Sequence, residues 1–569
     1  MRFLILASDY DGTLAHNGVA SDDALEGLRQ LRKSGRRSIL VTGRLLEDLR
    51  AVLAELELFD AIIVENGAVL YDPATREKRA LAPAPDPAFV AALQMKNVSP
   101  LEVGDVIVST WHPHEETVMQ TIRELGLDLA VIFNKGAVMV LPAGVNKATG
   151  LAAQVSALGL SLHNVAGIGD AENDLAFLAA CEASAATANA LDSVKNACDL
   201  VTGGDHGAGV AEFIERIIAD DLSGVPSIDL RHAIDLGSTA DGERVSVPAG
   251  CKGLLLAGTS GGGKTTLVAG FIERLSAQGY QFCIVDPEGD YASLPGTIAV
   301  GDAQSTPNLD TLAGVFAAEQ NPVVSLLAVE EADRPAFAHR LMARIAELRA
   351  AAGRPHWIVL DEAHHLFPAQ SEALPAVNIT PSTFFVTTRP ELVSAGALVD
   401  VEIVVAVGDD PSATIESARR ILGASDPGAA VALDHAHTGT AVVWKRSDPA
   451  RLLVIATTPG KSELRRHVRK YAEGELAPEK SFYFTGPEGR QNLRAQNLVT
   501  FAALSDGVDD ETWTYHLARH DYSNWMRNSI GDDELAEAVR KAEDDSGLGP
   551  RAARDAIIAA VRERYTSPG

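Results

Sequence analysis

Two aspartates near the start of the chain have the spacing that phosphoryl-transfer chemistry needs. The apolar run Phe3–Ala7 is followed closely by Asp9 and Asp11, and then by Gly12 and Thr13. One carboxylate of such a pair can attack a phosphorus atom, while the other protonates the leaving oxygen and later activates water. Gly12 allows the chain to turn, and Thr13 can form a local hydrogen bond. Taken alone, the pattern also fits a polar turn that ends a strand, because Asp-Gly is an ordinary turn signal.

Three later features supply what a nucleophilic aspartate requires. Thr42 follows a second apolar run and offers a hydroxyl, and Lys147 opens a helix and can neutralise a phosphoryl oxygen. The segment Gly169–Asp174 follows a further apolar run and offers carboxylates to a hard cation such as Mg²⁺. Because the carboxyl ends of parallel strands meet at one edge of a sheet, these residues are predicted to share one active site.

The elements expected to position these residues alternate between strands and helices. The runs RFLILA, RSILVTG, AIIVENGA and NVAGIGD read as buried strands, and DDALEGLRQLRKSG reads as an amphipathic helix that ends at Gly35. This order predicts an α/β fold with a parallel sheet. The composition changes after residue 75, where a small inserted α/β unit is expected. The predicted core is therefore 1–75 with 140–220, and the predicted cap is 76–139.

This ordered set of motifs resembles the haloacid-dehalogenase (HAD) phosphatase superfamily. It is most similar to the Cof-type branch, subfamily IIB, whose members carry an α/β cap between the second and third motifs. The resemblance extends to Glu65–Ala68 and to the segment 186–215. It implies a Rossmann-like parallel sheet, a Mg²⁺ cofactor and a phosphatase activity. The short cap favours a small phosphorylated metabolite, such as a sugar phosphate, as the substrate.

The resemblance also assigns roles to individual residues. Asp9 is the expected nucleophile, which forms an aspartyl-phosphate, and Asp11 is the expected general acid and base. Thr42 and Lys147 are expected to hold the phosphoryl group. The Mg²⁺ ligands are expected to be Asp9, the backbone carbonyl of Asp11 and Asp170, with Asp174 in support. Substrate contacts are expected from Gly43, Arg44, Asn66 and Asn173, although Arg44 fits a surface charge equally well.

A second phosphate motif follows some 250 residues later. It matches G-x-x-x-x-G-K-[ST] and comprises Gly258, Thr259, Ser260, Gly261, Gly262, Gly263, Lys264, Thr265 and Thr266. Between a strand and a helix, such backbone N–H groups cradle nucleotide phosphates, while Lys264 reaches the terminal ones and Thr265 holds Mg²⁺. Downstream, a buried strand ends in Asp361, a candidate Mg²⁺ ligand through water, and Glu362, which would polarise the attacking water. The alternative is a simple glycine-rich turn, but such a turn has no structural need for the pair Lys264 and Thr265.

This second region resembles the HerA/FtsK-type ATPases. The resemblance is carried by Val285–Tyr291, by Asp361–His364 and by Phe385–Pro390, in which Thr388 stands where Gln is more usual. It implies a P-loop NTPase domain of RecA-like α/β fold over 221–460, with ATP as its ligand. Residues 221–246 alone read as a polar crossing into that domain. It also implies a homo-oligomer, as in the hexameric members of that family. Arg419 and Arg420 are candidates for an arginine supplied to a neighbouring subunit, or belong to a solvated helix face.

Residues 461–569 are expected to form a mainly helical domain. They resemble a domain of unknown function that is sometimes appended to phosphatases of this type. The basic run Arg465–Lys470 fits a solvated helix face, or contact with phosphate or nucleic acid. The aromatic residues of this region are spaced as helical core residues, although a docking surface is the alternative: Trp513, Tyr515, Tyr522 and Trp525.

The totals limit the choice of function. The chain has 569 residues and a formal net charge of −28, which disfavours nucleic acid as a partner. No apolar run reaches the roughly 20 residues of a membrane helix, so a cytoplasmic protein without a membrane partner is expected. Two other classes stay open. One is a nucleic-acid end-processing or translocating enzyme that joins a polynucleotide phosphatase to a P-loop motor or kinase, and the other is a non-enzymatic scaffold.

Overall fold

The structure is a computed structural model, and it describes most of the chain. The described residues are 1–134, 136–259, 262–291, 294–370, 379–424, 439–460, 476, 481–530, 532–545 and 547–565. Ser260 and Gly261 of the glycine-rich motif, and the basic run Arg465–Lys470, lie outside them.

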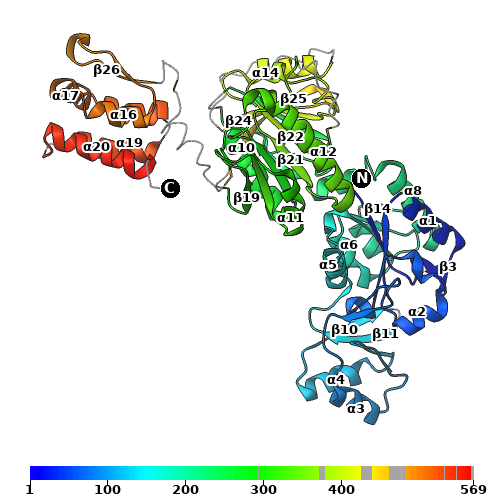
Figure 1. The fold of residues 1–569 in the computed structure, drawn as a ribbon. Coiled ribbons are helices and arrows are strands. Elements are labelled where there is room, and N and C mark those ends of the chain that lie inside the picture. Colours follow the sequence, from blue (N-terminus) through cyan, green and yellow to red (C-terminus); the bar gives the residue numbers. More distant parts are fainter. Residues whose placement is uncertain are drawn as a thin grey trace.

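The N-terminal part, coloured blue to cyan in Figure 1, is built on an eight-stranded sheet. Its strand order is β14-β13-β12-β1-β4-β5-β6-β7. The pairs from β14 to β5 are parallel, whereas β6 and β7 are antiparallel. The central strands β1 and β12 are buried along their whole length, and β4 along all but its first residue, because both faces of the sheet are covered. The strands are β1 (Ile5–Ser8), β4 (Arg37–Val41), β5 (Ala61–Val64), β6 (Val69–Tyr71), β7 (Lys78–Ala80), β12 (Val165–Gly169), β13 (Ala183–Ala186) and β14 (Leu200–Val201). β7 lies inside the range expected for the cap but extends the core sheet.

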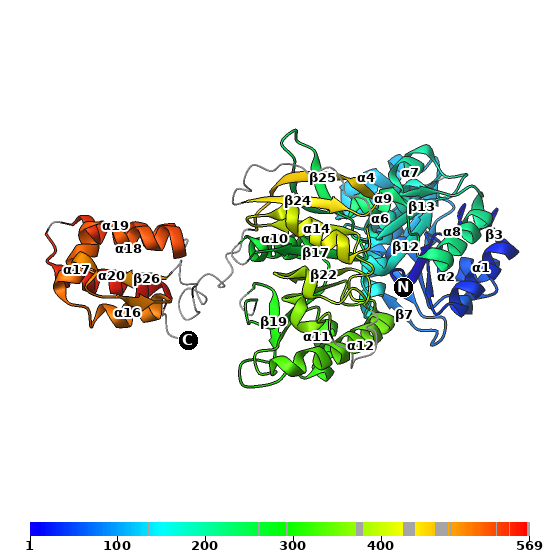
Figure 2. The same ribbon diagram turned by 90° about the horizontal axis from the view of Figure 1, so that it is seen from above.

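Helices cover both faces of this sheet. α1 and α8 pack together on one face (Figure 2), and their apolar residues belong to one core cluster. α5, α6 and α7 contribute to a second cluster on the other face. Ser21 caps α1 by accepting the backbone N–H of Ala24, and the helix stops before Gly35, as expected from the sequence. The helices are α1 (Asp22–Lys33), α2 (Leu46–Val52), α5 (Lys147–Ala157), α6 (Leu175–Ala180), α7 (Asp192–Ala197), α8 (His206–Asp220) and α9 (Pro226–Arg231). A small hairpin, β2 (Ala15–His16) and β3 (Val19–Ala20), follows β1.

The inserted cap is a four-stranded antiparallel sheet with two helices on one face. Its strand order is β10-β11-β9-β8. Val108, Val138 and Val140 pack with the helices. Met139 and Leu141, which alternate with them along β11, join the cluster of the core domain. The cap elements are α3 (Pro87–Met95), β8 (Glu102–Val103), β9 (Val108–Trp111), α4 (Glu115–Leu125), β10 (Leu129–Asn134) and β11 (Ala137–Pro142).

The middle part contains an eleven-stranded sheet with the order β16-β15-β25-β24-β23-β17-β22-β21-β18-β20-β19. The strands from β23 through β17 to β19 are parallel, and β24, β25, β15 and β16 add antiparallel strands. β22 lies between β17 and β21. The strands are β15 (Ile234–Ser238), β16 (Arg244–Val247), β17 (Gly253–Gly258), β18 (Phe282–Asp286), β19 (Thr297–Val300), β20 (Asn321–Ser325), β21 (Trp357–Leu360), β22 (Thr383–Thr387), β23 (Ile403–Val407), β24 (Thr440–Lys445) and β25 (Asp448–Thr457).

Residues 221–246 differ from the polar crossing that the sequence suggested. They include α9 and a β15–β16 hairpin that joins the large sheet, because Ile234, Leu236 and Val245 alternate with polar residues and are buried. The helices of the middle part cover both faces of its sheet, with α10 on one face and α12 and α14 on the other. They are α10 (Lys264–Ala277), α11 (Leu312–Ala317), α12 (Arg334–Ala352), α13 (Ala363–Leu366) and α14 (Pro411–Ile421).

The two sheets meet through the amino ends of their strands. Glu182, which precedes β13, is 1% exposed and accepts hydrogen bonds from Arg2 at 2.5 Å and from the Tyr280 hydroxyl at 2.9 Å. His163 stacks on Tyr280 with 3.8 Å between the ring centroids. Arg354, which precedes β21, donates to the carbonyl of Leu160 at 2.9 Å. The carboxyl ends of the two sheets therefore point away from this contact.

The C-terminal part forms its own core. Trp513 and Tyr522 are fully buried there, Trp525 is 7% exposed, and Tyr515 is half-buried. The described elements are β26 (Phe482–Phe484), β27 (Leu493–Ala495), α16 (Leu498–Ser505), α17 (Asp510–Ala518), α18 (Asp521–Trp525), a π-helix (Met526–Ile530), α19 (Asp533–Asp544) and α20 (Pro550–Tyr565). Among the helices of the described ranges, none has both the length and the apolar character needed to cross a membrane.

Candidate active site

The predicted HAD-type residues gather at the carboxyl edge of the eight-stranded sheet. Asp9 follows β1, Thr42 follows β4, and Asp170 follows β12. Lys147 is the first residue of α5, whose start is fixed by a capping box between Asn146 and Thr149. The five side chains with expected catalytic or metal roles in this cluster are almost completely buried: Asp9, Thr42, Lys147, Asp170 and Asp174.

Lys147 bridges two carboxylates. Its Nζ donates to Oδ1 of Asp9 and, at 2.6 Å, to Oδ1 of Asp174. Burial alone would lower the pKa of Lys147, but the charges of Asp174 and Asp9 outweigh burial and raise it. Burial, together with repulsion from Asp174, raises the pKa of Asp9 to about 8, although Lys147 acts in the opposite direction.

The carboxylates of this cluster fit the ligand preference of Mg²⁺. Asp9, Asp170 and Asp174 each offer an oxygen, and these oxygens lie within 4.8 Å of one another. All three donors are hard carboxylate oxygens, which suit Mg²⁺. Asp174 has a supporting position, because its Oδ2 accepts the backbone N–H groups of Asp170 and Ala171, both at 3.0 Å. Thr13 was expected to bond locally, but its hydroxyl donates to Oδ1 of Asp170 at 3.1 Å.

Asp11 lies outside this carboxylate group, and Arg44 holds its side chain. Nε and Nη2 of Arg44 donate to the two Asp11 oxygens at 2.6 and 2.7 Å. The other residues expected to contact substrate lie near one another. Asn66 has a left-handed backbone (φ 54°), donates its N–H to the Thr42 carbonyl, and lies 3.5 Å from the amide of Asn173. A Cβ at Gly43 would lie 3.5 Å from the Met139 sulfur of the cap.

Several residues near this site were missed by the sequence analysis. Glu65 belonged to a recognised motif but had no assigned role, and its carboxylate bonds to the cap. Asn189 donates to the Gly12 carbonyl at 2.7 Å, and His206 also contacts that carbonyl at 2.9 Å. The sulfur of Met139, on the cap strand β11, lies close to Gly43. None of these contacts follows a short sequence motif, because each depends on how distant segments are folded together.

The second predicted site lies at the carboxyl edge of the eleven-stranded sheet. Lys264 is the first residue of α10, is 4% exposed, and donates to the carbonyls of Gly258 and Thr259, both at 2.9 Å. Gly258 has φ 154° and Gly263 has φ 93°, and a Cβ at Gly258 would lie 2.0 Å from the Val407 carbonyl oxygen. The described part of the motif also contains Gly262, the half-buried Thr265 and the exposed Thr266.

The predicted acidic residues of this site lie at the end of a strand that is not adjacent to β17. Asp361 and Glu362 follow β21, which is separated from β17 by β22. Both are buried, and Glu362 has a left-handed backbone at φ 43°. Thr388, at the end of β22, places its hydroxyl 3.4 Å from a Glu362 oxygen. His364 lies 3.0 Å from the Thr387 hydroxyl and 3.4 Å from Glu362.

A loop next to these strands is shaped by one buried carboxylate. Asp286 ends β18 and accepts the backbone N–H groups of the four residues Glu288, Gly289, Asp290 and Tyr291. Burial raises the pKa of Asp286, although these four bonds act in the opposite direction. These contacts explain Asp286, the first acidic residue of the Val285–Tyr291 motif, as the residue that organises the turn.

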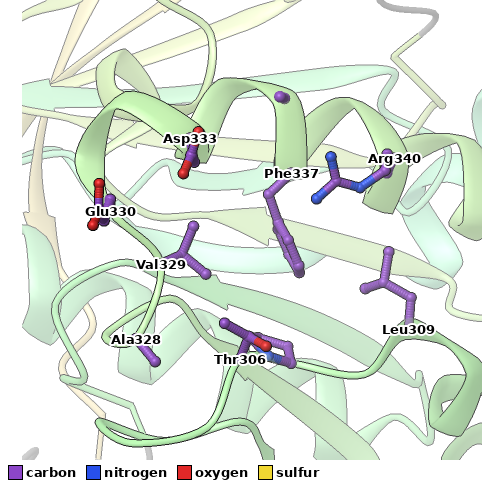
Figure 3. Close-up of a pocket in the computed structure, with 10 residues that line it drawn as sticks. Thr306, Leu309, Ala328, Val329, Glu330, Asp333, Phe337 and Arg340 are labelled. Atoms are coloured by element: carbon purple, nitrogen blue, oxygen red, sulfur yellow. The ribbon is translucent and has the colours of Figure 1, made fainter.

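A hollow of about 510 Å³ lies in the same unit, between the loop around Thr306–Leu309 and the start of α12 (Figure 3). Arg340 stands 5.6 Å from the Phe337 ring, and both side chains line the hollow with Glu330 and Asp333. None of these lining residues belongs to the two phosphate motifs.

The fold and the buried cluster define an α/β protein with a carboxylate site at its sheet edge. The sequence profile of the haloacid dehalogenase-like hydrolases matches residues 6–99 and 92–214. Through this N-terminal region the chain belongs to the haloacid dehalogenase-like hydrolases, which confirms the first resemblance.

Several relatives of known name match the same region. A phosphoglycolate phosphatase of Methanothermobacter thermautotrophicus is 31% identical over 219 residues, a match that covers 98% of that protein and 37% of this chain. A phosphoglycolate phosphatase of Methanobrevibacter smithii is 28% identical, over all of its length and 38% of this chain. Among solved structures, a haloacid dehalogenase-like hydrolase from Bacteroides thetaiotaomicron is 21% identical, with 99% of it and 38% of this chain covered and a TM-score of 0.34.

Proposed function

We propose that the N-terminal unit is a Mg²⁺-dependent phosphomonoesterase that acts on a small phosphorylated metabolite, such as a sugar phosphate or phosphoglycolate. The observation that carries this proposal is the position of Lys147, whose ammonium bridges Asp9 and Asp174 beside Asp170. A buried ion cluster adds little net stability compared with apolar packing, and strongly perturbed titratable groups gather at functional sites, so this cluster supports an active site. The relatives named as phosphoglycolate phosphatases support the same conclusion.

In the first step, Asp9 attacks the phosphorus atom of the substrate. Lys147 engages Oδ1 of Asp9, so Oδ2 is the attacking oxygen. The new bond joins Oδ2 to phosphorus, the bond from phosphorus to the leaving oxygen breaks, and Asp11 transfers its proton to that oxygen. The Thr42 hydroxyl and the Lys147 ammonium lie at the same edge and hold the phosphoryl oxygens.

In the second step, Asp11 acts as a base. It removes a proton from water, whose oxygen bonds to phosphorus while the bond to Asp9 breaks, so inorganic phosphate leaves and both aspartates return to their first state. The positive charge that Mg²⁺ supplies, when Asp9 and Asp170 hold it, offsets the charge on the phosphoryl oxygens.

The cap favours a small substrate. Met139 and Leu141 pack into the core cluster, and the Met139 sulfur lies close to Gly43 of the phosphate-binding loop. Met139 and its neighbours on β11 therefore form a roof beside Gly43 and the predicted substrate contact Asn66. A metabolite with a few carbon atoms fits beneath such a roof more readily than a nucleic-acid end.

The proposal is tested with Asp9→Asn in the full chain. This variant should lose phosphatase activity on a panel of sugar phosphates and 2-phosphoglycolate, because an amide is a poor nucleophile, while ATP binding is retained. Asp72→Asn is the matched control, since Asp72 is a loop residue that accepts the backbone N–H groups of Ala74 and Thr75. Unchanged turnover in Asp9→Asn would refute the assignment.

We further propose that residues 221–460 bind and hydrolyse ATP as a HerA-like P-loop module. The supporting observation is the strand order: Lys264 begins the 14-residue helix that follows β17, and Asp361 and Glu362 follow β21, with β22 between these two strands. The Thr388 contact links Glu362, the proposed base, to the residue that directly follows β22. β17, which leads into the motif, is buried along its whole length.

An ATPase assay on Glu362→Gln tests this second activity. Hydrolysis should fall by roughly a hundredfold, because general-base catalysis contributes at least that much, while ATP binding persists. Glu391→Gln, an exposed glutamate of the same unit, is the control. Equal hydrolysis in the two variants would exclude Glu362 as the base.

The nucleic-acid alternative is tested by adding DNA or RNA to the ATPase assay and by offering phosphorylated oligonucleotides to the phosphatase. Stimulation of ATP hydrolysis by DNA or RNA, together with release of phosphate from 3′-phosphorylated oligonucleotides, would favour an end-processing or translocating enzyme.

If the ATPase units form a ring, one subunit would supply an arginine to the ATP site of its neighbour. Arg419 is a poor candidate for that arginine because it is 3% exposed, with its guanidinium 5.6 Å from the Trp444 ring. Arg420 is exposed on the same helix and is the better candidate.

A further inference from the structure

Glu65 connects the core of the N-terminal unit to its cap. It follows β5, is 3% exposed, and has a left-handed backbone with φ 53°. Its carboxylate accepts three backbone N–H groups from one cap segment. Asp105 donates to Oε1 at 2.9 Å, and Val106 and Ile107 donate to Oε2 at 2.8 and 2.9 Å. A buried carboxylate that is satisfied by three consecutive amides is a charge-assisted anchor.

The cap segment is shaped to present these amides together. The N–H of Gly104 bonds to the carbonyl of Ile107 at 2.8 Å, which closes a tight turn. A Cβ at Gly104 would lie 2.7 Å from the Glu65 carboxylate and 2.7 Å from a methyl group of Leu45. Only glycine therefore allows the cap backbone to approach Glu65 this closely.

On its other side, Glu65 is bonded to the loop that carries the phosphate-binding residues. Its N–H donates to the Arg44 carbonyl at 2.9 Å, and the next residue, Asn66, donates its N–H to the Thr42 carbonyl at 3.0 Å. The Glu65–Asn66 turn thus lies between the Thr42–Arg44 loop and the cap. Both contacts use backbone atoms, so the position of this turn follows that of the loop.

The anchored segment leads directly into the roof of the site. It precedes β9, which pairs with β11, and Ser109 of β9 lies opposite Met139 of β11. The Met139 sulfur approaches Gly43. The position of Met139 and β11 relative to the Thr42–Arg44 loop therefore depends on the hydrogen bonds that Glu65 makes to the cap.

We propose that Glu65 is a positioning residue that docks the cap on the core and thereby sets how tightly a small phosphorylated substrate is enclosed. The inference rests on the proposed phosphatase function of the same site. The carboxylate does not touch the reacting atoms, and its effect passes through the cap backbone. An amide in its place has one acceptor oxygen and turns an NH₂ group toward the donors, so it cannot satisfy all three amides.

The first test is kinetic and uses Glu65→Gln in the full chain. For 2-phosphoglycolate, KM should rise about tenfold, the effect of losing one charge-assisted hydrogen bond, while kcat changes much less. For p-nitrophenyl phosphate, whose ring extends beyond a closed roof, kcat/KM should stay the same or rise. Glu102→Gln is the matched control, because Glu102 is an exposed cap residue that contacts Ser109 within the cap. A fall in kcat alone, or equal losses for both substrates, would overturn the proposal.

A second variant and a second measurement make the test independent of folding and of the substrate. Gly104→Ala should reproduce the kinetic effect of Glu65→Gln, and the double variant should add little, since both changes break one contact. Hydrogen exchange of the amides of residues 105–107 should be faster in Glu65→Gln than in the wild type and unchanged in Glu102→Gln. If the wild type has no phosphatase activity but these amides lose protection, the docking role stands and the proposed function fails. Unchanged exchange refutes the docking role itself.

Discussion

Arg44 binds the carboxylate of Asp11 through two hydrogen bonds of 2.6 and 2.7 Å, one from Nε and one from Nη2. The pair is partly exposed, so it is accessible from the site. In the mechanism proposed above, Asp11 carries a proton when the leaving oxygen departs, and a protonated carboxyl attracts a guanidinium less. Arg44 is then available to an anionic group of the substrate, which reconciles its contact with Asp11 and its predicted role as a substrate contact.

Replacement of Arg44 by lysine should therefore weaken the binding of anionic substrates. A lysine cannot form the fork, so KM for 2-phosphoglycolate should rise about tenfold, whereas KM for p-nitrophenyl phosphate should change less. Steady-state kinetics on both substrates measure the difference. Arg29→Lys is the matched control because Nη2 of Arg29 donates to both carboxylate oxygens of Glu55 near the surface, at 2.8 and 2.7 Å. Equal changes in KM for the two substrates would contradict this role.

Lys147 should contribute more to stability than a surface lysine. Lys147→Met leaves Asp9 and Asp174 facing each other in a buried site, and loss of one member of a buried ion cluster costs about 3 kcal/mol or more. Thermal unfolding without Mg²⁺ should show this loss. Lys96→Met, which breaks a pair with Glu124 at the surface, should cost at most about 1 kcal/mol. Similar losses in the two variants would show that the buried cluster has no special weight.

Mg²⁺ should stabilise the N-terminal unit through Asp170. At a concentration about 100 times its dissociation constant, an ion that binds only the folded state adds about 2.7 kcal/mol, and the unfolding temperature should rise accordingly. Asp170→Asn removes one of the three clustered carboxylates and should abolish most of that rise. Asp72→Asn should retain it. A full Mg²⁺ effect in Asp170→Asn would place the ion elsewhere.

The parts of this site that were predictable follow from strand ends. Asp9, Thr42 and Asp170 each come after an apolar run, and parallel strands bring their carboxyl ends to one edge, so their proximity could be expected from the sequence. The fork between Arg44 and Asp11 could not, because it depends on side-chain reach across two loops. Glu65 was also unpredictable, since its partners are backbone amides that no residue type reveals.

The fold shows the same division. The buried strands of both sheets were recognisable because they are continuous apolar runs. The β15–β16 hairpin was not, because its apolar residues alternate with polar ones over a short length, and its place at the edge of the large sheet depends on pairing with the distant β25. Local patterns identify elements, and pairing between distant segments decides their final positions.

Glu182 should make the protein sensitive to acid. Burial alone would raise the pKa of Glu182, but a hydrogen bond from His163 and the charge of Arg2 outweigh burial and hold it well below its usual range. A carboxyl whose pKa is depressed by folding stabilises the protein above its unfolded pKa of about 4.3, and this contribution is lost as the pH falls toward the folded value.

The unfolding temperature of the wild type should therefore fall on acidification below about pH 4.3, and that of Glu182→Gln should fall less. At pH 7 the variant should be less stable by about 3 kcal/mol, because Arg2 and His163 lose a buried charged partner. Glu319→Gln is the control at the same interface, since Glu319 is 68% exposed beside Arg354. A parallel acid response in Glu182→Gln and the wild type would show that another carboxyl governs it.

The two proposed phosphate sites lie at the carboxyl edges of sheets that meet through their amino edges, so a phosphate group cannot pass directly between them within one chain. Lys264→Ala should therefore abolish ATP binding while phosphatase kcat/KM, measured without ATP, stays within about twofold of the wild type, because sites this far apart act independently unless a conformational change links them. Sedimentation should show ATP-dependent assembly for the wild type and for Lys252→Ala, an exposed lysine before β17, but not for Lys264→Ala. Loss of phosphatase activity in ATP-free Lys264→Ala would contradict the separation of the sites. If the wild type and both variants assemble to the same extent with and without ATP, nucleotide binding does not control the oligomeric state.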